Sequence, residues 1–427
     1  MTQIYKLLLK QHIGNPDSPC VKEGDVVKRG SRIASANGLG ADLHASVSGK
    51  VIKVTPEAIL IKGDKPEKDE FESLRPGTIA ERVRSAGIVG MGGAGFPTGI
   101  KLSQKISGGT VIVNAAECEP ILLHNIAQIE SNPDEVYRGL LYAMEAVDAA
   151  RGVIAIKAKH KKAVSLIKEA INDDRVSVFL MPDLYPVGEE RALIRDILGK
   201  LLPPEERVIT ANAIVINSET LSRVTQAVEL GRPAVSKNLT IAGKLYGGAK
   251  SIPLMDVPIG TRIGDLIESV GGIDGDYGEI LMGGPFTGHR VTLDDVVTKT
   301  SGGIIVTMPF LKERSPIGLL VCACSADETR MKEMAYEMGG DVVDVQKCKY
   351  AVKARGALRC QNPGVCPGQA DRLLKLRKAG AKAVLIGNCS DCTNTVMQIA
   401  PKLHLHVHHV TDSAMRAMGL HLIRKLH

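Results

Sequence analysis

Aromatic side chains are scarce in this chain of 427 residues, and tryptophan is absent. Phe, Tyr and Trp together make up 3% of the residues. Because proteins that bind single-stranded nucleic acid stack its bases on aromatic rings, this scarcity argues against that function. The net charge of +7 is spread along the sequence, and the basic run at residues 157–162 is better explained as a helix start or loop than as a nucleic-acid patch. We therefore expect no nucleic-acid partner.

Long apolar runs are missing as well. No run approaches the roughly 18 residues that a membrane-spanning helix needs. The opening residues, MTQIYKLLLKQH, are too polar for a signal peptide and lack a small-residue cleavage site. We expect a cytoplasmic protein with no direct membrane insertion, in which nine cysteines indicate metal or redox chemistry more than structural disulfides.

The first region predicts a small β domain. Residues 1–65 show short strands separated by Gly turns, and the repeated pattern resembles the barrel-sandwich fold of lipoyl and biotinyl carriers. Those carriers need a lysine at a hairpin tip, where this chain has residues 37–40 (Asn-Gly-Leu-Gly), so we expect an unmodified domain. The charged stretch 62–72 that follows is typical of a linker.

Three further regions complete an α/β multidomain prediction. Residues 75–235 alternate buried strands with helical patterns, which predicts a parallel α/β domain. Residues 236–305 return to short strands with one helix, and we expect a β-grasp module of the SLBB-like kind. Residues 315–427 alternate again and predict a smaller α/β redox domain holding seven of the nine cysteines. The strands expected in the two α/β domains are 109–114, 152–157, 176–180, 213–217, 318–322, 342–345, 383–387 and 403–410.

A glycine-rich loop at residues 90–101 (GMGGAGFPTGIK) is the strongest local motif. Four glycines within six residues let the backbone approach a flat or anionic ligand, because no Cβ is in the way. Successive N–H groups in such a loop form an anion-binding nest, and a helix after Pro97 adds its positive end. The loop therefore predicts a ligand-binding site.

This loop and three other segments together resemble one family. It is the family of FMN-binding, NADH-oxidising subunits of respiratory complex I and of the related C subunit of the Rnf complex. The resemblance covers about residues 1–310. The motifs that carry it are residues 90–101, 114–120 (NAAECEP), 185–193 (YPVGEERAL) and 217–221 (NSETL), with 11–14, 44–49 and 282–285 resembling the Rnf type.

The resemblance implies FMN and NADH as cofactors and names their site. In this family the glycine loop and its lysine hold FMN. The resemblance also implies that Phe96 stacks on the nicotinamide nucleotide. Ala116 and Ile216 depart from the complex I motif, which has Asp and Asn there, and predict an altered flavin affinity. The implied cofactor-binding residues are Gly90, Gly92, Gly93, Gly95, Phe96, Lys101, Asn114, Glu117, Glu119, Tyr185, Gly188, Glu189, Glu190, Asn217 and Thr220.

The C-terminal region departs further from the Rnf pattern. Rnf-type proteins continue into a ferredoxin module with C-x-x-C-x-x-C-x-x-x-C-P runs, and none occurs here. The chain instead resembles Rnf-C-like proteins that serve D-proline reductase, whose terminal region carries redox-active cysteine or selenocysteine. This implies electron transfer from NADH through FMN to a partner reductase.

Cys389 and Cys392 form the sharpest thiol motif and are the predicted catalytic dithiol. A C-x-x-C spacing at a helix start permits a disulfide and stabilises thiolate. One alternative is an iron–sulfur cluster, or a zinc site, on Cys322, Cys324, Cys360 and Cys366, although no metal is the preferred prediction. Another is a non-catalytic docking scaffold.

Four other residue groups have lesser roles in this scheme. Cys118 is expected to pack within the flavin-site motif, and Cys20 and Cys348 to be structural. His404, His406 and His408 alternate on one expected strand and so share a face, either as metal ligands or, more commonly, as a half-exposed surface.

Overall fold

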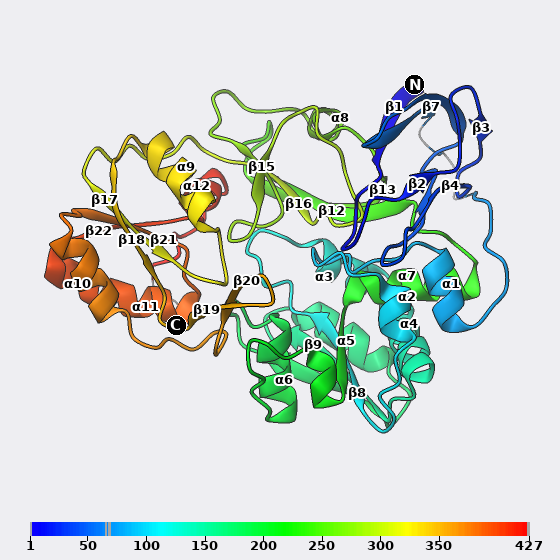
Figure 1. Cartoon of the computed structure of the whole chain (residues 1–427), viewed down its shortest axis with the longest axis horizontal. Coiled ribbons are helices and arrows are strands. Elements are labelled where there is room, and N and C mark those ends of the chain that lie inside the picture. Colours follow the sequence, from blue (N-terminus) through cyan, green and yellow to red (C-terminus); the bar gives the residue numbers. More distant parts are fainter. Residues whose placement is uncertain (1, 65, 67–69, 425–427) are drawn as a thin grey trace.

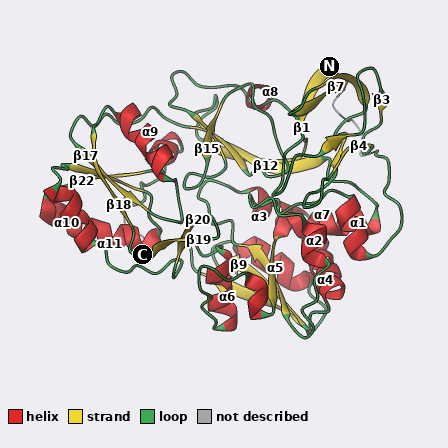
Figure 2. Cartoon of the chain, viewed as in Figure 1, coloured by secondary structure: helices red, strands yellow, loops and turns green. Residues whose placement is uncertain are grey.

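The computed structural model describes residues 2–64, 66 and 70–424. Its sheets fall into four successive regions, with the N-terminal strands and the last region at opposite ends of the molecule (Figure 1). Helices gather on the second and fourth regions, and the first is built from strands (Figure 2). In the described part of the chain, no helix is both long and apolar enough to cross a bilayer.

The first region is two sheets around one core. A four-stranded antiparallel sheet, β1-β7-β6-β3, shares buried side chains with a three-stranded sheet, β2-β4-β5. Tyr5 and Leu7 alternate with more exposed neighbours along β1, as one buried face of a strand requires. The predicted linker 62–72 overlaps β7 and in part lies outside the described residues. The strands are β1 (Thr2–Leu8), β2 (Ser18–Pro19), β3 (Val26–Val27), β4 (Arg32–Ser35), β5 (Leu43–His44), β6 (Gly49–Val54) and β7 (Ala58–Asp64).

The second region confirms the predicted parallel α/β sheet. Its strand order is β10-β9-β8-β11, with every pairing parallel. The strands are β8 (Thr110–Ala115), β9 (Arg151–Lys157), β10 (Val176–Met181) and β11 (Ala213–Asn217). The helices are α1 (Ile79–Ser85), α2 (Thr98–Leu102), α3 (His124–Ser131), α4 (Pro133–Val147), α5 (Lys161–Ala170), α6 (Glu190–Leu198), α7 (Ser218–Glu229) and a 3₁₀ turn, Val208–Ala211.

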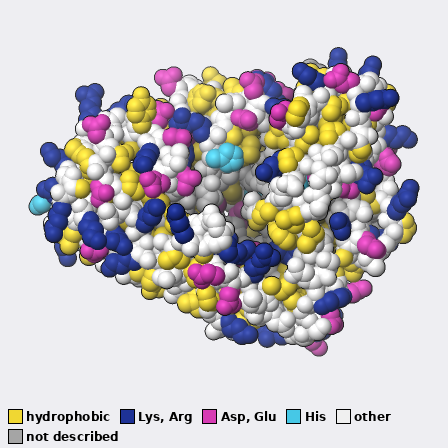
Figure 3. Space-filling model, in the orientation of Figure 1, with side chains coloured by type: hydrophobic (Ala, Val, Ile, Leu, Met, Phe, Trp, Pro, Cys, Tyr) yellow, Lys and Arg dark blue, Asp and Glu magenta, His cyan; other side chains and the backbone are white. Residues whose placement is uncertain are grey.

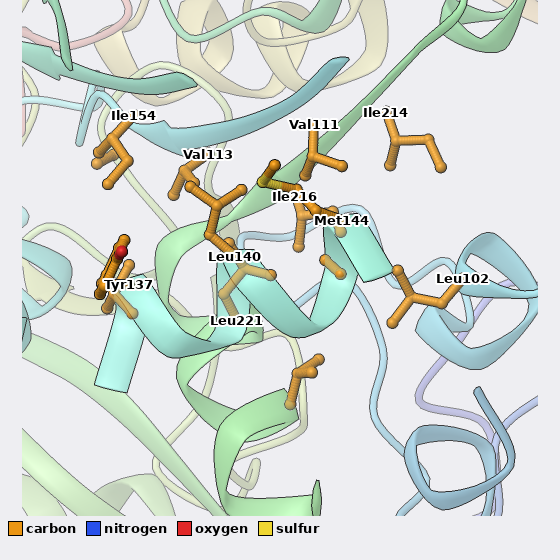
Figure 4. Close-up of a cluster of buried hydrophobic side chains, with 14 of the residues drawn as sticks. Leu102, Val111, Val113, Tyr137, Leu140, Met144, Ile154, Ile214, Ile216 and Leu221 are labelled. Carbon is orange, nitrogen blue, oxygen red and sulfur yellow. The ribbon is translucent and has the colours of Figure 1, made fainter. Parts of the chain in front are cut away.

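Helix α4 shows why this region folds as it does. Asn132 accepts a hydrogen bond from the Glu135 amide, Pro133 begins the helix, and Asp148 ends it in the left-handed conformation. Its apolar face, with Leu140 and Met144, packs on the side chains of β8, β9 and β11 (Figure 4). This burial fixes the sheet whose carboxyl ends carry the candidate site.

The third region is a five-stranded mixed sheet in the order β13-β12-β16-β14-β15 with one helix. The one predicted helix appears as α8, and Gly271 and Gly272, both with positive φ, follow it. Its assignment as a β-grasp, SLBB-like module remains a prediction. The elements are β12 (Ser236–Gly243), β13 (Lys250–Pro258), α8 (Ile263–Ser269), β14 (Ile280–Met282), β15 (His289–Val291) and β16 (Gly303–Val306).

The fourth region is a parallel sheet, β18-β17-β21-β22, with a separate hairpin, β19-β20. The expected strand 403–410 is wrong in extent, because residues 400–403 form a 3₁₀ turn and His404 is left-handed with φ of 53°. The elements are β17 (Ile317–Val321), α9 (Glu328–Met338), β18 (Val342–Lys347), β19 (Ala351–Ala354), β20 (Ala357–Cys360), α10 (Ala370–Lys378), β21 (Ala383–Ile386), α11 (Ser390–Ile399), the 3₁₀ turn Ala400–Leu403, β22 (His406–His409) and α12 (Asp412–Ala417).

Candidate functional site

The glycine loop is folded back on itself and fastened to α7. The Gly90 amide donates to the Phe96 carbonyl at 2.9 Å, and the Met91 amide donates to Thr220 Oγ1 at 3.0 Å. Residues 92–94 are exposed, and their amides donate to no acceptor within the described residues. The loop thus presents free N–H groups to solvent, which is the arrangement that an anionic ligand requires.

Asn217 holds the other side of this loop. It caps α7, since its Oδ1 accepts from the amides of Glu219 and Thr220 at 3.0 and 3.3 Å. A Cβ on Gly92 would lie 3.0 Å from Asn217 Nδ2. Glycine at 92 therefore permits the loop to lie against the cap, and Asn217 and Thr220 support the loop in this structure.

Lys101 places a cation at the carboxyl end of the sheet. Its Nζ donates to the carbonyl of Val215 on β11 at 2.9 Å and lies 3.8 Å from Glu190 Oε1. The Phe96 ring centroid is 6.0 Å from the same Nζ. Because the side chain is 27% exposed, its charge remains available to a ligand at the loop.

Asn114 and the loop before α6 meet at the end of β8. Asn114 Nδ2 donates to the Gly188 carbonyl at 2.9 Å, and a Cβ on Gly188 would lie 3.2 Å from Asn114 Oδ1. Glu189 caps α6 by accepting from the amides of Arg191 and Ala192 at 2.8 and 3.0 Å. The Glu189 carboxylate is thus engaged with the helix start, whereas Glu190 is exposed.

Glu117 is the most perturbed carboxyl group near this site. Its backbone has φ of 38°, and its carboxylate accepts from the Asn125 amide at 2.8 Å and from Asn125 Nδ2 at 3.3 Å. Burial raises the pKa of Glu117 to about 7, although the hydrogen bonds from Asn125 oppose the shift. Asn125 has no local sequence signature that would have predicted this role.

Two predicted site residues face the neighbouring regions. Glu119 accepts from the amides of Phe286 and Thr287, each at 2.9 Å, and from Thr287 Oγ1 at 2.6 Å. Tyr185 stacks on Phe286 with ring centroids 3.7 Å apart, and its hydroxyl donates to the Cys324 carbonyl. Glu119 therefore joins the second region to the third, and Tyr185 joins it to both the third and the fourth.

The two departures from the complex I motif are core side chains. Ala116 is 1% exposed and packs in one hydrophobic cluster of the second region, and Ile216, 3% exposed, packs in the other. Ile216 lies among the side chains beneath the sheet in Figure 4. Neither side chain lies on the exposed surface of the glycine loop. Neither therefore replaces a residue that contacts a ligand there.

The face drawn in Figure 3 is hollowed near its middle. Comparison with Figure 1 places this hollow where β16, β20 and the loop after β8 approach one another. Lys and Arg side chains gather on its lower rim (Figure 3). The hollow is positively charged on that rim, as suits a phosphate-bearing ligand.

Seven cysteines are brought together between the second and fourth regions, and we call them the thiol cluster. The thiols lie close enough to one another to shift one another's pKa. Cys348, which the sequence predicted to be structural, lies in the middle of the group. The members are Cys322, Cys324, Cys348, Cys360, Cys366, Cys389 and Cys392.

The predicted dithiol lies inside this cluster. Cys389 takes the cap position of α11, and the Cys392 thiol is within hydrogen-bond reach of it. Both are buried, at 3% and 2% exposed. Across the described ranges, no group of three or more Cys, His, Asp or Glu side chains is placed to hold a metal ion. The alternative metal or cluster site on Cys322, Cys324, Cys360 and Cys366 stays a prediction.

The histidine prediction was partly wrong. His404 is not on the strand, whereas His406 and His408 are on β22. Their ring nitrogens both lie 3.2 Å from Glu313 Oε2, so the two rings share one carboxylate oxygen as a hydrogen-bond partner.

Known protein families match two separate regions of the chain. Residues 1–66 match the RnfC barrel sandwich hybrid domain family, and residues 83–226 match the Nuo51 FMN-binding domain family. The C subunit of the Na⁺-translocating ferredoxin:NAD⁺ oxidoreductase complex of Acetobacterium woodii is 33% identical over 337 residues, covering 73% of this chain and 75% of that protein. The proton-translocating counterpart of Clostridium ljungdahlii is 33% identical, covering 70% and 69%. Cobalamin reductase PduS of Citrobacter freundii is 37% identical, covering 54% and 49%.

The fold, the site and these matches define an NADH-linked flavoprotein oxidoreductase with FMN and NADH as its cofactors. More particularly, the chain belongs to the RnfC family, the C subunits of the ion-translocating oxidoreductase complexes. The residues present fit FMN, because the free amides of residues 92–94 and the Lys101 cation suit its phosphate.

Proposed function

We propose that this protein oxidises NADH on FMN and passes the electrons, through the Cys389–Cys392 dithiol, to a partner reductase of the D-proline reductase kind. One contact carries the proposal. The Tyr185 amide donates to Ser390 Oγ at 2.8 Å, and the Ser390 amide donates to the Tyr185 carbonyl at 3.0 Å. Ser390 stands between the two cysteines, so the dithiol is fastened to the loop that also carries Gly188 and Glu190.

A second set of contacts reinforces this attachment. On α6, Arg195 Nη1 donates to Asn362 Oδ1 at 2.6 Å and to the Pro363 carbonyl at 2.7 Å. Arg191, on the same helix, donates to the Cys360 carbonyl. The helix that begins at the proposed flavin site therefore also binds a segment of the thiol cluster, which supports direct exchange of electrons between the two.

Within the proposed site each group has a separate task. The amides of residues 92–94 and Lys101 bind the flavin phosphate, and Glu190 orients the nucleotide. A bound FMN would supply the hydride acceptor for the nicotinamide and an outlet for electrons singly or in pairs. Because burial raises the pKa of Glu117 to about 7, its carboxyl group can take up and release a proton near neutral pH.

The dithiol and the partner are supported by different observations. A C-x-x-C pair in contact can cycle between disulfide and dithiol by a two-electron step. The chain lacks ferredoxin cysteine runs, and its terminal region resembles that of the proteins serving D-proline reductase. Nine free thiols suit the reducing cytoplasm, which is where we place the protein.

Electron flow to two acceptors tests the proposal. The FMN-reconstituted full-length protein is supplied with NADH without oxygen, and turnover is measured with ferricyanide, which accepts from flavin, and with the disulfide reagent dithiobis-nitrobenzoate. We expect turnover with both, and Cys392→Ser to lower the disulfide-to-ferricyanide ratio by roughly 100-fold, since one thiol of the dithiol is removed and the disulfide can no longer form. Cys20→Ser, on the first region, is the matched control and keeps the ratio.

Two results would count against this scheme. An unchanged ratio in Cys392→Ser would remove the dithiol from the pathway. Failure of the wild-type protein to take up FMN, or of NADH to bleach it, would favour a docking scaffold instead.

A further inference from the structure

Gln369 is at the centre of three thiols of the cluster. Its Nε2 lies 3.3 Å from Cys348 Sγ, 3.3 Å from Cys392 Sγ and 3.8 Å from Cys366 Sγ. The side chain is fully buried, and its Oε1 has no hydrogen-bond partner in the described part of the chain. Because an amide N–H binds a thiolate more strongly than a thiol, Gln369 favours an ionised sulfur at this position.

These thiols differ in their access to a partner. Cys348 and Cys392 are 3% and 2% exposed, as is Cys389 at 3%. Cys366 is partly exposed, next to the exposed Val365, in the loop between β20 and α10. A disulfide carried by another protein can therefore meet Cys366, whereas the buried thiols are closed to it.

Cys366 is also held and activated. Its amide donates to Asp391 Oδ2 at 2.7 Å, and the Gly368 amide donates to its sulfur at 3.3 Å. The neighbouring Cys392 thiol, with smaller contributions from Thr395, the Gly368 amide and Gln369, lowers the pKa of Cys366 to about 6. An accessible thiolate at neutral pH is the nucleophile that disulfide exchange requires.

We propose that electrons leave this protein through Cys366 and Cys392, with Gln369 as the positioning residue, and that the acceptor is a disulfide in a partner protein. The inference rests on the proposed function and names the residues through which the electrons leave. Cys389 then exchanges only with Cys392, inside the protein. Cys392 therefore belongs to two pairs, Cys366–Cys392 and Cys389–Cys392.

The exchange balances in two steps. The Cys366 thiolate attacks one sulfur of the partner's disulfide, the partner's S–S bond breaks, and the leaving sulfur departs as a thiolate that takes a proton. Cys392, after losing its proton, attacks Cys366 Sγ, which forms the Cys366–Cys392 disulfide and releases the second thiolate of the partner. Two electrons pass to the partner, and NADH supplies the two that restore the dithiol.

Tryptic peptides allow the pair to be identified directly. Cleavage after Arg359 and Arg372 places Cys366 on one peptide, and cleavage after Lys382 and Lys402 places Cys389 and Cys392 together on another. The reduced full-length protein is treated with a limiting amount of dithiodipyridine without NADH, the remaining thiols are alkylated after denaturation, and the digest is examined by mass spectrometry.

We expect the first disulfide to join the two peptides, in the wild-type protein and in Cys389→Ser alike, and to be lost in Cys366→Ser. A link through Cys360, which shares the peptide with Cys366, is distinguished by Cys360→Ser. A first disulfide contained within the second peptide, or one that survives Cys366→Ser, would overturn the proposal. No NADH or flavin is used, so failure here is separate from failure of the flavin chemistry.

The positioning role of Gln369 has its own measurement. The rate at which iodoacetamide alkylates Cys366 is followed against pH in Gln369→Ala and in the control Gln361→Ala, an exposed amide in the same loop. We expect the midpoint to move to higher pH in Gln369→Ala only. An unmoved midpoint would show that Gln369 does not act on the thiolate.

Discussion

Glu117→Gln should change the pH dependence of stability. Burial raises the pKa of Glu117 from its ordinary value of 4.5 to about 7, so the folded protein holds this proton more tightly than the unfolded chain does. Between these two values the unfolded state binds fewer protons, and stability therefore falls as the pH rises through the window. Above pH 7 the group is ionised in both the folded and the unfolded state, so the full free-energy cost of burying the carboxylate applies.

The size of the effect follows from the two pKa values. At about 1.4 kcal/mol for each pH unit between 4.5 and 7, ionising the buried carboxyl costs on the order of 3 kcal/mol. Glutamine cannot ionise and can still accept the hydrogen bond from the Asn125 amide. We expect the variant to be more stable than the wild type above neutral pH by up to that amount, and to lose the advantage as the pH falls towards 4.5.

Urea unfolding at a series of pH values measures this difference. The exposed carboxylate Glu205 supplies the control, Glu205→Gln, for which we expect no difference that grows with pH. A Glu117→Gln advantage that stays constant across the pH range, or that grows as the pH falls, would refute the assignment of a buried, destabilised carboxylate.

Three further changes have expected outcomes. Lys101→Met removes the cation beside the glycine loop and should raise the FMN dissociation constant about 10-fold to 100-fold, as measured by fluorescence titration, because a hydrogen bond to a charged group contributes about 1.5–3 kcal/mol. Lys237→Met removes one of the two cations paired with the fully buried Glu219, leaves Arg223 Nη2 at 3.6 Å as the other, and should lower the free energy of unfolding by about 1.5–3 kcal/mol. Tyr185→Phe leaves the Cys324 carbonyl without its donor and should cost about 1–3 kcal/mol, seen as a lower urea midpoint.

The parallel strands could be predicted from the sequence for a physical reason. Runs such as residues 110–115 and 213–217 are continuous, apolar and rich in β-branched residues, as strands buried on both faces must be. Residues 403–410, in which His404, His406 and His408 alternate with apolar residues, were also expected to be a strand, yet the strand is only His406–His409. The preceding 3₁₀ turn contains Pro401, and His404 adopts a left-handed conformation, so the strand cannot begin earlier.

The candidate site was predictable where it depends on local backbone chemistry. The glycine loop is recognised by residue type and spacing, whereas Lys101 and Asn217 were implied by the resemblance to the family. The thiol cluster depends instead on contacts between distant segments, such as Gln369 with Cys348 and Cys392. No spacing rule brings those three residues together, and for that reason the sequence predicted Cys348 to be structural.

An anaerobic titration of the FMN-reconstituted protein with NADH, followed by the visible absorption of the flavin, is the decisive measurement for the coupling of the two redox centres. With the thiol cluster first oxidised to disulfides, we expect bleaching to complete only after more NADH has been consumed than the flavin alone accepts, because reducing equivalents pass on to those disulfides. If bleaching completes when only the NADH needed to reduce the flavin has been consumed, electron transfer from the flavin to the thiol cluster is contradicted.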